Sequence, residues 1–243
     1  MQSKTRDGVR IILLQVRSHL VSLRQEREWF RERCGVSEDY FGVINLVDEP
    51  AITWDDVRHA DTVMIGGAGA YTAYEDHDFT APLEEVVNRL LDEERPLFGS
   101  CWGHQFMARI LGGSVGPDHE RSEVGSYDIH LTEAGRHDPL FDGLPPTFVA
   151  QLGHNDRIIE LPDTMVELAR SASCPYQAVR VAGKPAYGTQ FHSEMTHFQL
   201  RERLEVYRDE YMPDPEEFAR LSERLRPSPE VDGLLGRFLD LYT

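Results

Sequence analysis

The sequence predicts an α/β protein of three layers, with helices on both faces of a mostly parallel central sheet and a helical extension at the C-terminus. Three patterns lead to this prediction. From about residue 9 to residue 112, short aliphatic and β-branched runs alternate with longer segments of helical period. From residue 114 to residue 194, short strand-like runs predominate. After residue 194 the patterning is helical.

The first half of the chain is expected to contain strands at 9–16, 41–47, 62–65 and 96–100. The helix between the last two strands has Pro82 in its first turn and an apolar stripe that should face the sheet. This stripe consists of Leu83, Val86, Val87, Leu90 and Leu91. An earlier helix runs from Ser18 to Cys34 and stops at Gly35. Its thinner stripe consists of Leu20, Leu23, Phe30 and Cys34.

The second half of the chain is richer in strands than in helices. Strands are expected at 123–132, 147–159, 165–173 and 176–192, the last of them divided by a turn at 183–185. In the tail, one helix begins with Asp214 as N-cap and Pro215 in its first turn, and another follows Pro229. We expect residues 1–197 to form one domain and residues 198–243 to form a helical extension packed on it.

Charge and composition exclude several classes of function. The 243 residues include 42 acidic and 25 basic side chains, for a formal net charge of −17. Binding to nucleic acid or to an anionic membrane surface requires clustered cations, so neither partner is expected. No apolar run approaches the roughly 20 residues of a membrane-spanning helix. The first residues also lack a secretory cleavage site, so we expect a cytoplasmic protein.

Three cysteines, Cys34, Cys101 and Cys174, are widely spaced along the chain. An odd, scattered set resembles neither a disulfide framework nor a zinc-ligand quartet, so we expect no metal and no cofactor. If one of these cysteines is functional, we expect its role to be that of a reactive thiol. Cys34 at a helix end and Cys174 beside a proline have no reactive context and are expected to be buried structural residues.

Cys101 is the candidate nucleophile. It is the central residue of GSCWG, which follows a buried-strand run and precedes a helix that ends at Gly112. Glycines two residues before and two residues after Cys101 allow the chain to reverse sharply, as in a nucleophile elbow. Such an elbow places the thiol at a helix N-terminus, where the helix dipole favours the thiolate.

The candidate base is His192, in the sequence QFHSE after a strand-like run. In extended chain the side chains at i and i+2 share a face, so Glu194 can orient His192. Two other histidines compete for the role. His104 lies three residues after Cys101, which points it along the elbow helix rather than across the thiol. His154 stands in a polar HND sequence that turn capping explains about as well.

A glycine-rich loop, IGGAG, follows the strand at 62–65. Backbone N–H groups in such a loop, together with the N–H of Trp102, can face a developing oxyanion. A phosphate cradle is a weaker interpretation, because no Gly-Lys-Ser/Thr follows and no G-x-G-x-x-G opens a helix.

These motifs together resemble the class I (triad) glutamine amidotransferases, and most closely the amidotransferase domain of GMP synthetase and its stand-alone relatives. The resemblance rests on IGGAG, GSCWGHQ, SEVGSYDIHLT, GHNDRIIELP and TQFHSE, and spans about residues 9–194. It implies a flavodoxin-like fold. It also implies roles for six residues: Cys101 as nucleophile, His192 as base and acid, Glu194 as the residue that orients His192, Gly67 and Trp102 as oxyanion N–H donors, and Gln105 as a substrate-binding residue.

The chain departs from the family pattern at two positions. Ser193 stands where the family usually has proline between its histidine and glutamate, and the glycine loop continues as Ala68-Gly69 where the family often has Gly-Pro. Neither change removes a reacting group. The second leaves open which backbone N–H groups face the oxyanion.

The reaction expected from this resemblance is hydrolysis of the glutamine side-chain amide through a thioester on Cys101. Because only a helical tail follows residue 194, the ammonia acceptor is expected to be a separate synthetase chain. Two alternatives remain. The same triad can hydrolyse γ-glutamyl amides or peptides without an acceptor. A non-catalytic protein with a regulatory or binding role is the other, although the joint presence of Cys101, His192 and Glu194 argues against it.

Overall fold

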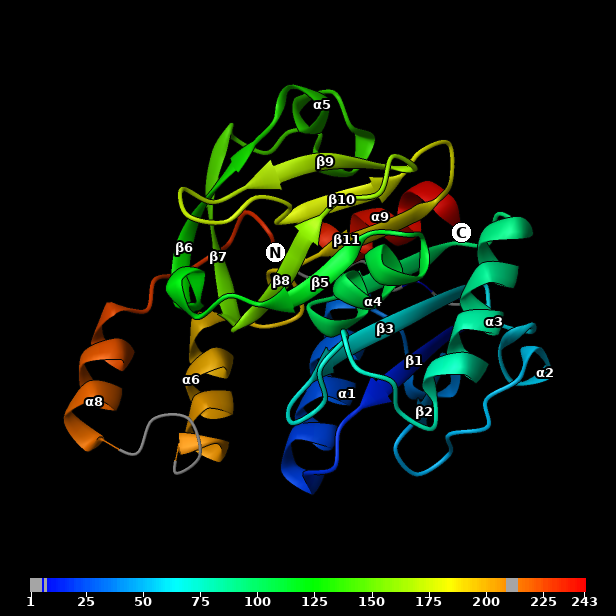
Figure 1. Cartoon of the computed structure of the whole chain (residues 1–243), viewed down its shortest axis with the longest axis horizontal. Coiled ribbons are helices and arrows are strands. Elements are labelled where there is room, and N and C mark those ends of the chain that lie inside the picture. The colour runs from blue at the N-terminus through cyan, green and yellow to red at the C-terminus, as the bar shows by residue number, and fades with distance from the viewer. Residues whose placement is uncertain (1–5, 7, 209–213) are drawn as a thin grey trace.

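A computed structural model of the chain describes residue 6, residues 8–208 and residues 214–243, and is built around a nine-stranded sheet (Figure 1). The strand order is β2-β1-β3-β4-β11-β10-β9-β6-β7. The first five strands in this order pair in parallel. Their bounds are β2 (Phe41–Asn45), β1 (Ile11–Val16), β3 (Thr62–Ala68), β4 (Leu97–Ser100) and β11 (Ala186–Thr189).

The other half of the sheet is antiparallel. It consists of β10 (Ala178–Val181), β9 (Met165–Arg170), β6 (Glu123–Leu131) and β7 (Thr147–His154). A separate two-stranded sheet pairs β5 (Ser114–Pro117) with β8 (Asp156–Glu160). The α/β fold class is confirmed, but parallel pairing is confined to β2, β1, β3, β4 and β11, the last of which comes from the strand-rich second half of the chain.

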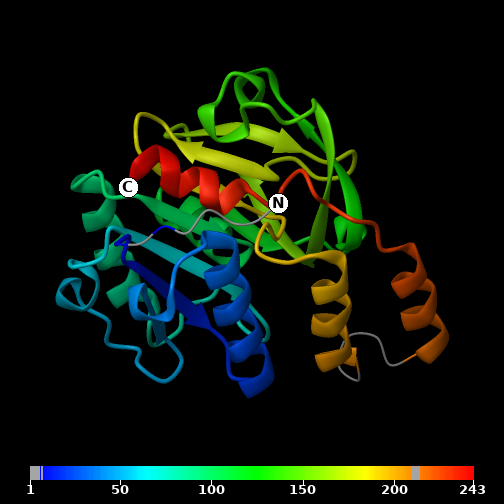
Figure 2. The same cartoon turned by 180° about the vertical axis from the view of Figure 1, so that it is seen from behind.

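Two layers of helices cover the sheet, each packed on its own apolar core (Figures 1 and 2). One face carries α2 (Trp54–Val57), α3 (Thr80–Asp92) and α4 (Trp102–Ile110). The opposite face carries α1 (Leu20–Cys34) and α9 (Leu234–Tyr242). Short elements complete the chain: η1 (Glu38–Tyr40), η2 (His119–Arg121), α5 (Glu133–Arg136) and η3 (Pro139–Phe141).

The described residues of the tail include three helices, α6 (His197–Val206), α8 (Pro215–Arg224) and α9. Asp214 caps α8, because its carboxylate accepts a hydrogen bond from the backbone N–H of Glu216. In α9, Phe238 packs edge-on against Phe98 of the central sheet, with ring centres 5.4 Å apart. Figure 2 shows α6 and α8 beside each other next to the antiparallel half of the sheet. Within the described residues, no helix is both long and apolar enough to cross a bilayer.

The structure confirms some local predictions and corrects others. All five apolar residues predicted for the α3 stripe are buried. In α1 the predicted stripe is wrong at its first position, because Leu20 is 69% exposed while the polar residues Ser22 and Glu26 are buried. Glu26 is buried because it finds charged and polar partners inside the protein. The strand expected at 147–159 is two strands, and β8 leaves the central sheet after Asn155.

Candidate active site

Cys101 occupies a sharp turn between the end of β4 and the start of α4. Its backbone has φ 49° and ψ −97°, a conformation that costs free energy for a residue with a side chain. The glycines on both sides are required by close packing. A Cβ atom on Gly99 would lie 2.6 Å from the carbonyl carbon of Gly103, and one on Gly103 would lie 2.6 Å from the carbonyl oxygen of Ile65. This is the geometry expected of a nucleophile elbow.

The thiol of Cys101 faces a cavity of about 520 Å³ at the carboxyl ends of the parallel strands. The cavity wall includes His192, Gln105 and the glycine loop after β3. The tail also lines the cavity, through Leu200, Arg203, Leu204 and Tyr207. Switch points at this end of a parallel sheet are where α/β proteins bind small molecules. The tail therefore contributes to the shape of this site.

His192 and Glu194 form a buried ion pair next to Cys101. The Nδ1 atom of His192 lies 2.5 Å from Oε1 of Glu194, and Oγ of Ser100 donates to Oε2 of the same carboxylate at 3.1 Å. Burial lowers the pKa of His192, but the negative charge of Glu194 and the adjacent thiol outweigh it and raise the pKa to about 10. The imidazolium and Ser100 keep the pKa of Glu194 below its usual value despite burial.

The thiol and the imidazole lie side by side around Gly67. A Cβ atom on Gly67 would be 3.3 Å from Cε1 of His192 and 3.6 Å from Cβ of Cys101. Two backbone hydrogen bonds hold these segments. The N–H of Cys101 donates to the carbonyl of Thr189 at 2.7 Å, and the N–H of His192 donates to the carbonyl of Gln151 at 2.9 Å.

A chain of amide hydrogen bonds also reaches the thiol. Nε2 of Gln190 donates to Sγ of Cys101 at 3.4 Å. Nε2 of Gln105 in turn donates to Oε1 of Gln190 at 2.9 Å and to the carbonyl oxygen of Asp156 at 2.7 Å. Both glutamine side chains are buried. The side-chain amide of Gln105 is therefore tied into the wall of the cavity, where it orients Gln190.

The two predicted oxyanion donors differ in the structure. Trp102 is the first residue of α4, so its N–H has no carbonyl partner within the helix. The N–H of Gly67, in contrast, donates to Oε1 of Glu26 at 3.1 Å. The expected donor in the glycine loop is therefore already engaged by a buried carboxylate.

Comparison with known proteins identifies the family. The family model described as glutamine amidotransferase class-I matches residues 41–206, more than half of the chain. The chain belongs to the class-I glutamine amidotransferases. A glutamine-hydrolysing GMP synthase subunit from Methanopyrus kandleri is 34% identical over 158 residues, covering 65% of this chain and 79% of that protein. The corresponding subunit from Archaeoglobus fulgidus is 31% identical over 168 residues, covering 69% and 84%.

The fold of this class-I glutamine amidotransferase also matches solved structures. A glutamine amidotransferase from Thermotoga maritima superposes with a TM-score of 0.73 at 23% identity, covering 98% of this chain and 99% of that one. At this identity the likeness supports the fold alone. Together with the family match, it confirms the sequence-based assignment to this enzyme family and to its α/β architecture.

The competing histidines of the amidotransferase occupy other environments. His104 is buried beneath β11, where a Cβ atom on Gly188 would lie 2.8 Å from its Nδ1 atom. Burial lowers the pKa of His104 to about 3. His154 lines the cavity, but its Nδ1 faces the carbonyl oxygen of Asp156 at 3.0 Å and its Nε2 faces Oε2 of Glu123 at 3.2 Å. Neither ring nitrogen of His154 is directed at the thiol of Cys101.

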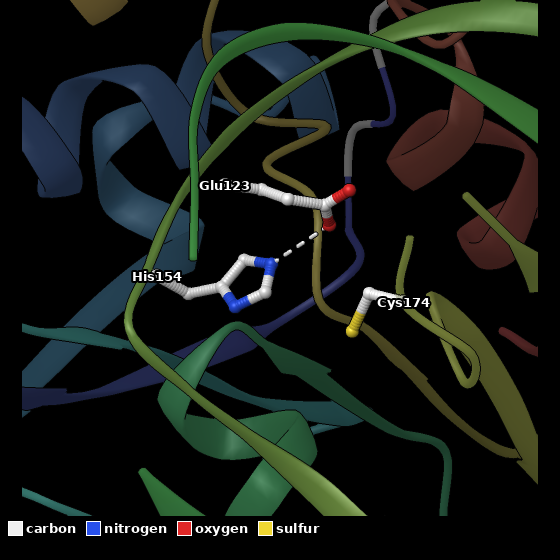
Figure 3. Close-up of side chains that lie close together, drawn as sticks. All are labelled: Glu123, His154 and Cys174. Carbon is white, nitrogen blue, oxygen red and sulfur yellow. Dashed lines mark hydrogen bonds and ion pairs between the residues drawn. The ribbon is translucent and has the colours of Figure 1, made fainter. Parts of the chain in front are cut away.

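Glu123, His154 and Cys174 lie close together and offer one nitrogen, one oxygen and one sulfur within 4.8 Å of one another (Figure 3). Such atoms are potential metal ligands. The carboxylate is already satisfied by hydrogen-bond donors from four side chains, Ser171, Ser173, Gln177 and His154. Burial raises the pKa of Cys174 to about 12, which opposes formation of the thiolate that a metal requires. We interpret the cluster as a hydrogen-bond network that joins β6 and β7 to residues 171–177.

Sequence reasoning missed three polar residues at the site: Gln190, Arg17 and Glu26. Gln190 stood inside a motif already singled out, two residues before His192. Arg17 had a positional signal, because it directly follows the buried strand β1 and a charged side chain there reaches the carboxyl edge of the sheet. Glu26 had no such signal in the sequence, because a glutamate within a charged helix is expected to be exposed to solvent.

Proposed function

We propose that the enzyme hydrolyses the side-chain amide of glutamine with Cys101 as nucleophile, His192 as base and acid, and Glu194 as the residue that orients His192. The Cys101 thiolate attacks the amide carbon, and the carbonyl electron pair moves onto oxygen. As the tetrahedral intermediate collapses, the C–N bond breaks and His192 gives its proton to the departing ammonia. Water, deprotonated by His192, then cleaves the thioester to glutamate.

One observation supports this proposal above the others. A thiol on a strained turn, an imidazole and a buried carboxylate converge on one cavity, and the imidazole pairs with the carboxylate at 2.5 Å. The raised pKa of His192 favours an imidazolium next to the sulfur, which stabilises the thiolate. General acid and base catalysis of this kind contributes about 10²–10⁴-fold in rate.

The other predicted residues keep narrower roles in the proposal. The N–H of Trp102 donates to the oxyanion. Gln105 contacts substrate as part of the cavity wall. The N–H of Gly67 is left out, because it already donates to Glu26.

We further propose that the ammonia is released to a synthetase on a separate chain. Two relatives, 34% and 31% identical to this chain, are each named as one lettered subunit of a glutamine-hydrolysing GMP synthase, and such a name implies a second subunit. By analogy, this chain would be the ammonia-supplying member of such a pair.

The nucleophile is tested by intact-mass analysis after treatment with a chloroketone analogue of glutamine. One adduct is expected, with protection by free glutamine and no adduct on Cys101→Ala. The same variant should release ammonia from glutamine at a rate indistinguishable from the buffer. Cys174→Ala is the matched control and should still form the adduct. Labelling that persists in Cys101→Ala would contradict the proposal.

The size of the cavity favours a second candidate function, hydrolysis of γ-glutamyl amides with larger amines. A volume of about 520 Å³ is typical of sites for whole small molecules, and the cavity extends from Cys101 to the tail helix α6. A panel of γ-glutamyl amides assayed beside glutamine distinguishes the two functions. A strict amidotransferase should be slow with bulky amine leaving groups, whereas a γ-glutamyl hydrolase should prefer them.

A further inference from the structure

Arg17 is a buried cation at the catalytic cavity. It directly follows β1, its side chain is 3% exposed, and it lines the cavity. Nε of Arg17 donates to Oε1 of Glu26 at 2.9 Å, and Nη1 donates to the hydroxyl of Tyr207 at 3.4 Å. These contacts fix the position of the guanidinium group. The same carboxylate is held by Nε2 of Gln15 at 2.9 Å and by the N–H of Gly67.

The third guanidinium nitrogen, Nη2, takes part in no hydrogen bond within the part of the chain that the structure describes. It lies beside the reacting groups. A Cβ atom on Gly67 would be 2.9 Å from Nη2 of Arg17, 3.3 Å from Cε1 of His192 and 3.6 Å from Cβ of Cys101. Two N–H bonds of a positively charged group are thus available in the space next to Cys101 and His192.

A second buried cation lies near Arg17. Arg203 of α6 also lines the cavity and is buried. Burial and the charge of Arg17 lower the pKa of Arg203 to about 9, against the opposing effects of Glu26, Tyr207 and Glu194. Of the two carboxylates that act on Arg203, Glu26 is paired with Arg17 and Glu194 is paired with His192. An additional negative charge is favoured here, because a low-dielectric wall strengthens its attraction to both arginines.

We propose that Nη2 of Arg17 donates a hydrogen bond to the oxyanion of the tetrahedral intermediate, in the role that the family resemblance implied for the N–H of Gly67. This inference rests on the proposed function. When Sγ of Cys101 bonds to the amide carbon, the carbonyl electron pair moves to oxygen and Arg17 stabilises that charge without giving up a proton. On collapse the pair returns to re-form C=O, the C–N bond breaks, and ammonia takes its proton from His192. Glu26 is the positioning residue that holds Arg17.

The position of Nη2 predicts whether substitution of Arg17 changes kcat or KM. A donor next to Cys101 and His192 meets the reacting end of the substrate, where charge appears only in the transition state. Arg17→Gln is therefore expected to lower kcat for glutamine about 100- to 1000-fold, with KM changed less than about threefold. A group that bound the α-carboxylate of the substrate would instead raise KM.

Two further measurements separate oxyanion stabilisation from an effect on the thiol. The γ-aldehyde analogue of glutamate adds the Cys101 thiol to form a tetrahedral adduct, and Arg17→Gln should weaken its inhibition by a factor similar to the loss in kcat. Iodoacetamide alkylates the thiolate without any tetrahedral oxyanion. Its rate, measured at a pH where the thiol is ionised, should change less than about threefold in the same variant.

Arg17→Gln leaves Glu26 without its charged partner, so the variant is paired with a double substitution. Arg17→Gln with Glu26→Gln keeps amide hydrogen bonds in place of the ion pair and removes the unpaired buried carboxylate. This double variant should melt closer to the parent while keeping the full loss in kcat. Arg180→Gln is the matched control, because Arg180 pairs with the buried Asp138 outside the cavity, at 3.0 Å. It should melt earlier than the parent with kcat within about threefold.

These measurements have outcomes that either support or overturn the role of Arg17. The proposal is supported if kcat and aldehyde inhibition fall together in both Arg17 variants while alkylation persists. It is overturned if kcat is retained, if the loss lies in KM, or if alkylation falls in parallel with kcat. The parent enzyme separates this inference from the proposed function. If the parent hydrolyses glutamine through Cys101, a negative result concerns Arg17 alone, whereas a parent without Cys101-dependent turnover contradicts the proposed function itself.

Discussion

Two buried carboxylates, Glu26 and Glu123, lie in different halves of the protein and differ in whether a charged neighbour faces the catalytic cavity. Each side chain is 1% exposed. Glu123, in the antiparallel half, accepts hydrogen bonds from four side chains, and its neighbour His154 directs both ring nitrogens at fixed oxygen atoms. Glu26, from a helix over the parallel half, also has its oxygens occupied, but its partner Arg17 keeps one nitrogen open to the cavity.

The difference indicates how to interpret a buried charge. The Glu123 network leaves no cation open: the four side-chain donors to its carboxylate are used within the protein, and only the amide oxygen of Gln177 lacks a partner among the described residues. Such a network holds segments together and offers no positive charge to a ligand. A network with one open cation beside a nucleophile has a free energy that falls when an anion arrives. Glu123 therefore belongs to the scaffold, and the Arg17–Glu26 pair belongs to the site. Four predictions sharpen or break this distinction.

The largest loss of activity is expected on replacing a third buried carboxylate, Glu194. Glu194→Gln removes the negative charge that favours the imidazolium form of His192, so the pKa of His192 should fall. We expect kcat to drop by roughly 10³–10⁴-fold, as when the orienting carboxylate of other triads is replaced. NMR titration of the His192 ring measures the pKa. An unchanged titration would contradict the role of Glu194.

Breaking the Glu123 network should affect stability rather than chemistry. Glu123→Leu removes the carboxylate acceptor of three buried donors, Ser171, His154 and Gln177, and is expected to cost about 3–5 kcal/mol in the free energy of unfolding. Urea unfolding measures the loss, and kcat per folded molecule should stay within about threefold. A large loss in kcat at full folding would place Glu123 in the catalytic machinery and erase the distinction drawn above.

The amide of Gln190 should have an intermediate effect. Gln190→Leu removes its hydrogen bond to Sγ of Cys101, and a hydrogen bond to a charged group contributes about 1.5 kcal/mol. The rate of alkylation by iodoacetamide at neutral pH should therefore fall about tenfold, because the thiolate loses a hydrogen-bond donor. Gln177→Leu, in the Glu123 network, is the control and should leave the alkylation profile of Cys101 unchanged.

Substitution of Cys174 should have the smallest effect on activity. Burial raises the pKa of this thiol to about 12, so iodoacetamide should leave it unmodified at pH 7.5 while Cys101 reacts. Cys174→Ala should retain kcat within about twofold. Peptide mapping after alkylation checks the first statement and a glutaminase assay the second. Modification of Cys174 in the folded enzyme would mean that its network opens.

The His192–Glu194 pair also gives the folded state a defined pH dependence. Because folding raises the pKa of His192 to about 10, its contribution to stability is fully present below pH 6.5 and is lost as the pH rises through 10. Folding lowers the pKa of Glu194, so its contribution is present above the usual glutamate pKa and is lost as the pH falls through the lowered value. In Glu194→Gln the alkaline part of this dependence should disappear from urea-unfolding curves.

The sequence by itself determined the features that depend on local spacing. The apolar period of α3, the glycines on either side of Cys101 and the two-residue separation of His192 and Glu194 each encode their geometry within a few residues. Helical period, steric freedom of glycine and alternation in extended chain are properties of short segments. For that reason the elbow and the family resemblance were accessible without any structure.

Only the tertiary structure decided which distant groups meet. Glu26 became a buried partner of Arg17 and Gly67, Gln190 reached the thiol, and the run 147–159 divided between two sheets. Each outcome depends on contacts between segments that are far apart in the chain, and a charged helical residue or a strand-like run has the same local pattern whichever contact it makes. Burial of a charge is favourable only when its partners are already in place, and those partners are supplied by the fold.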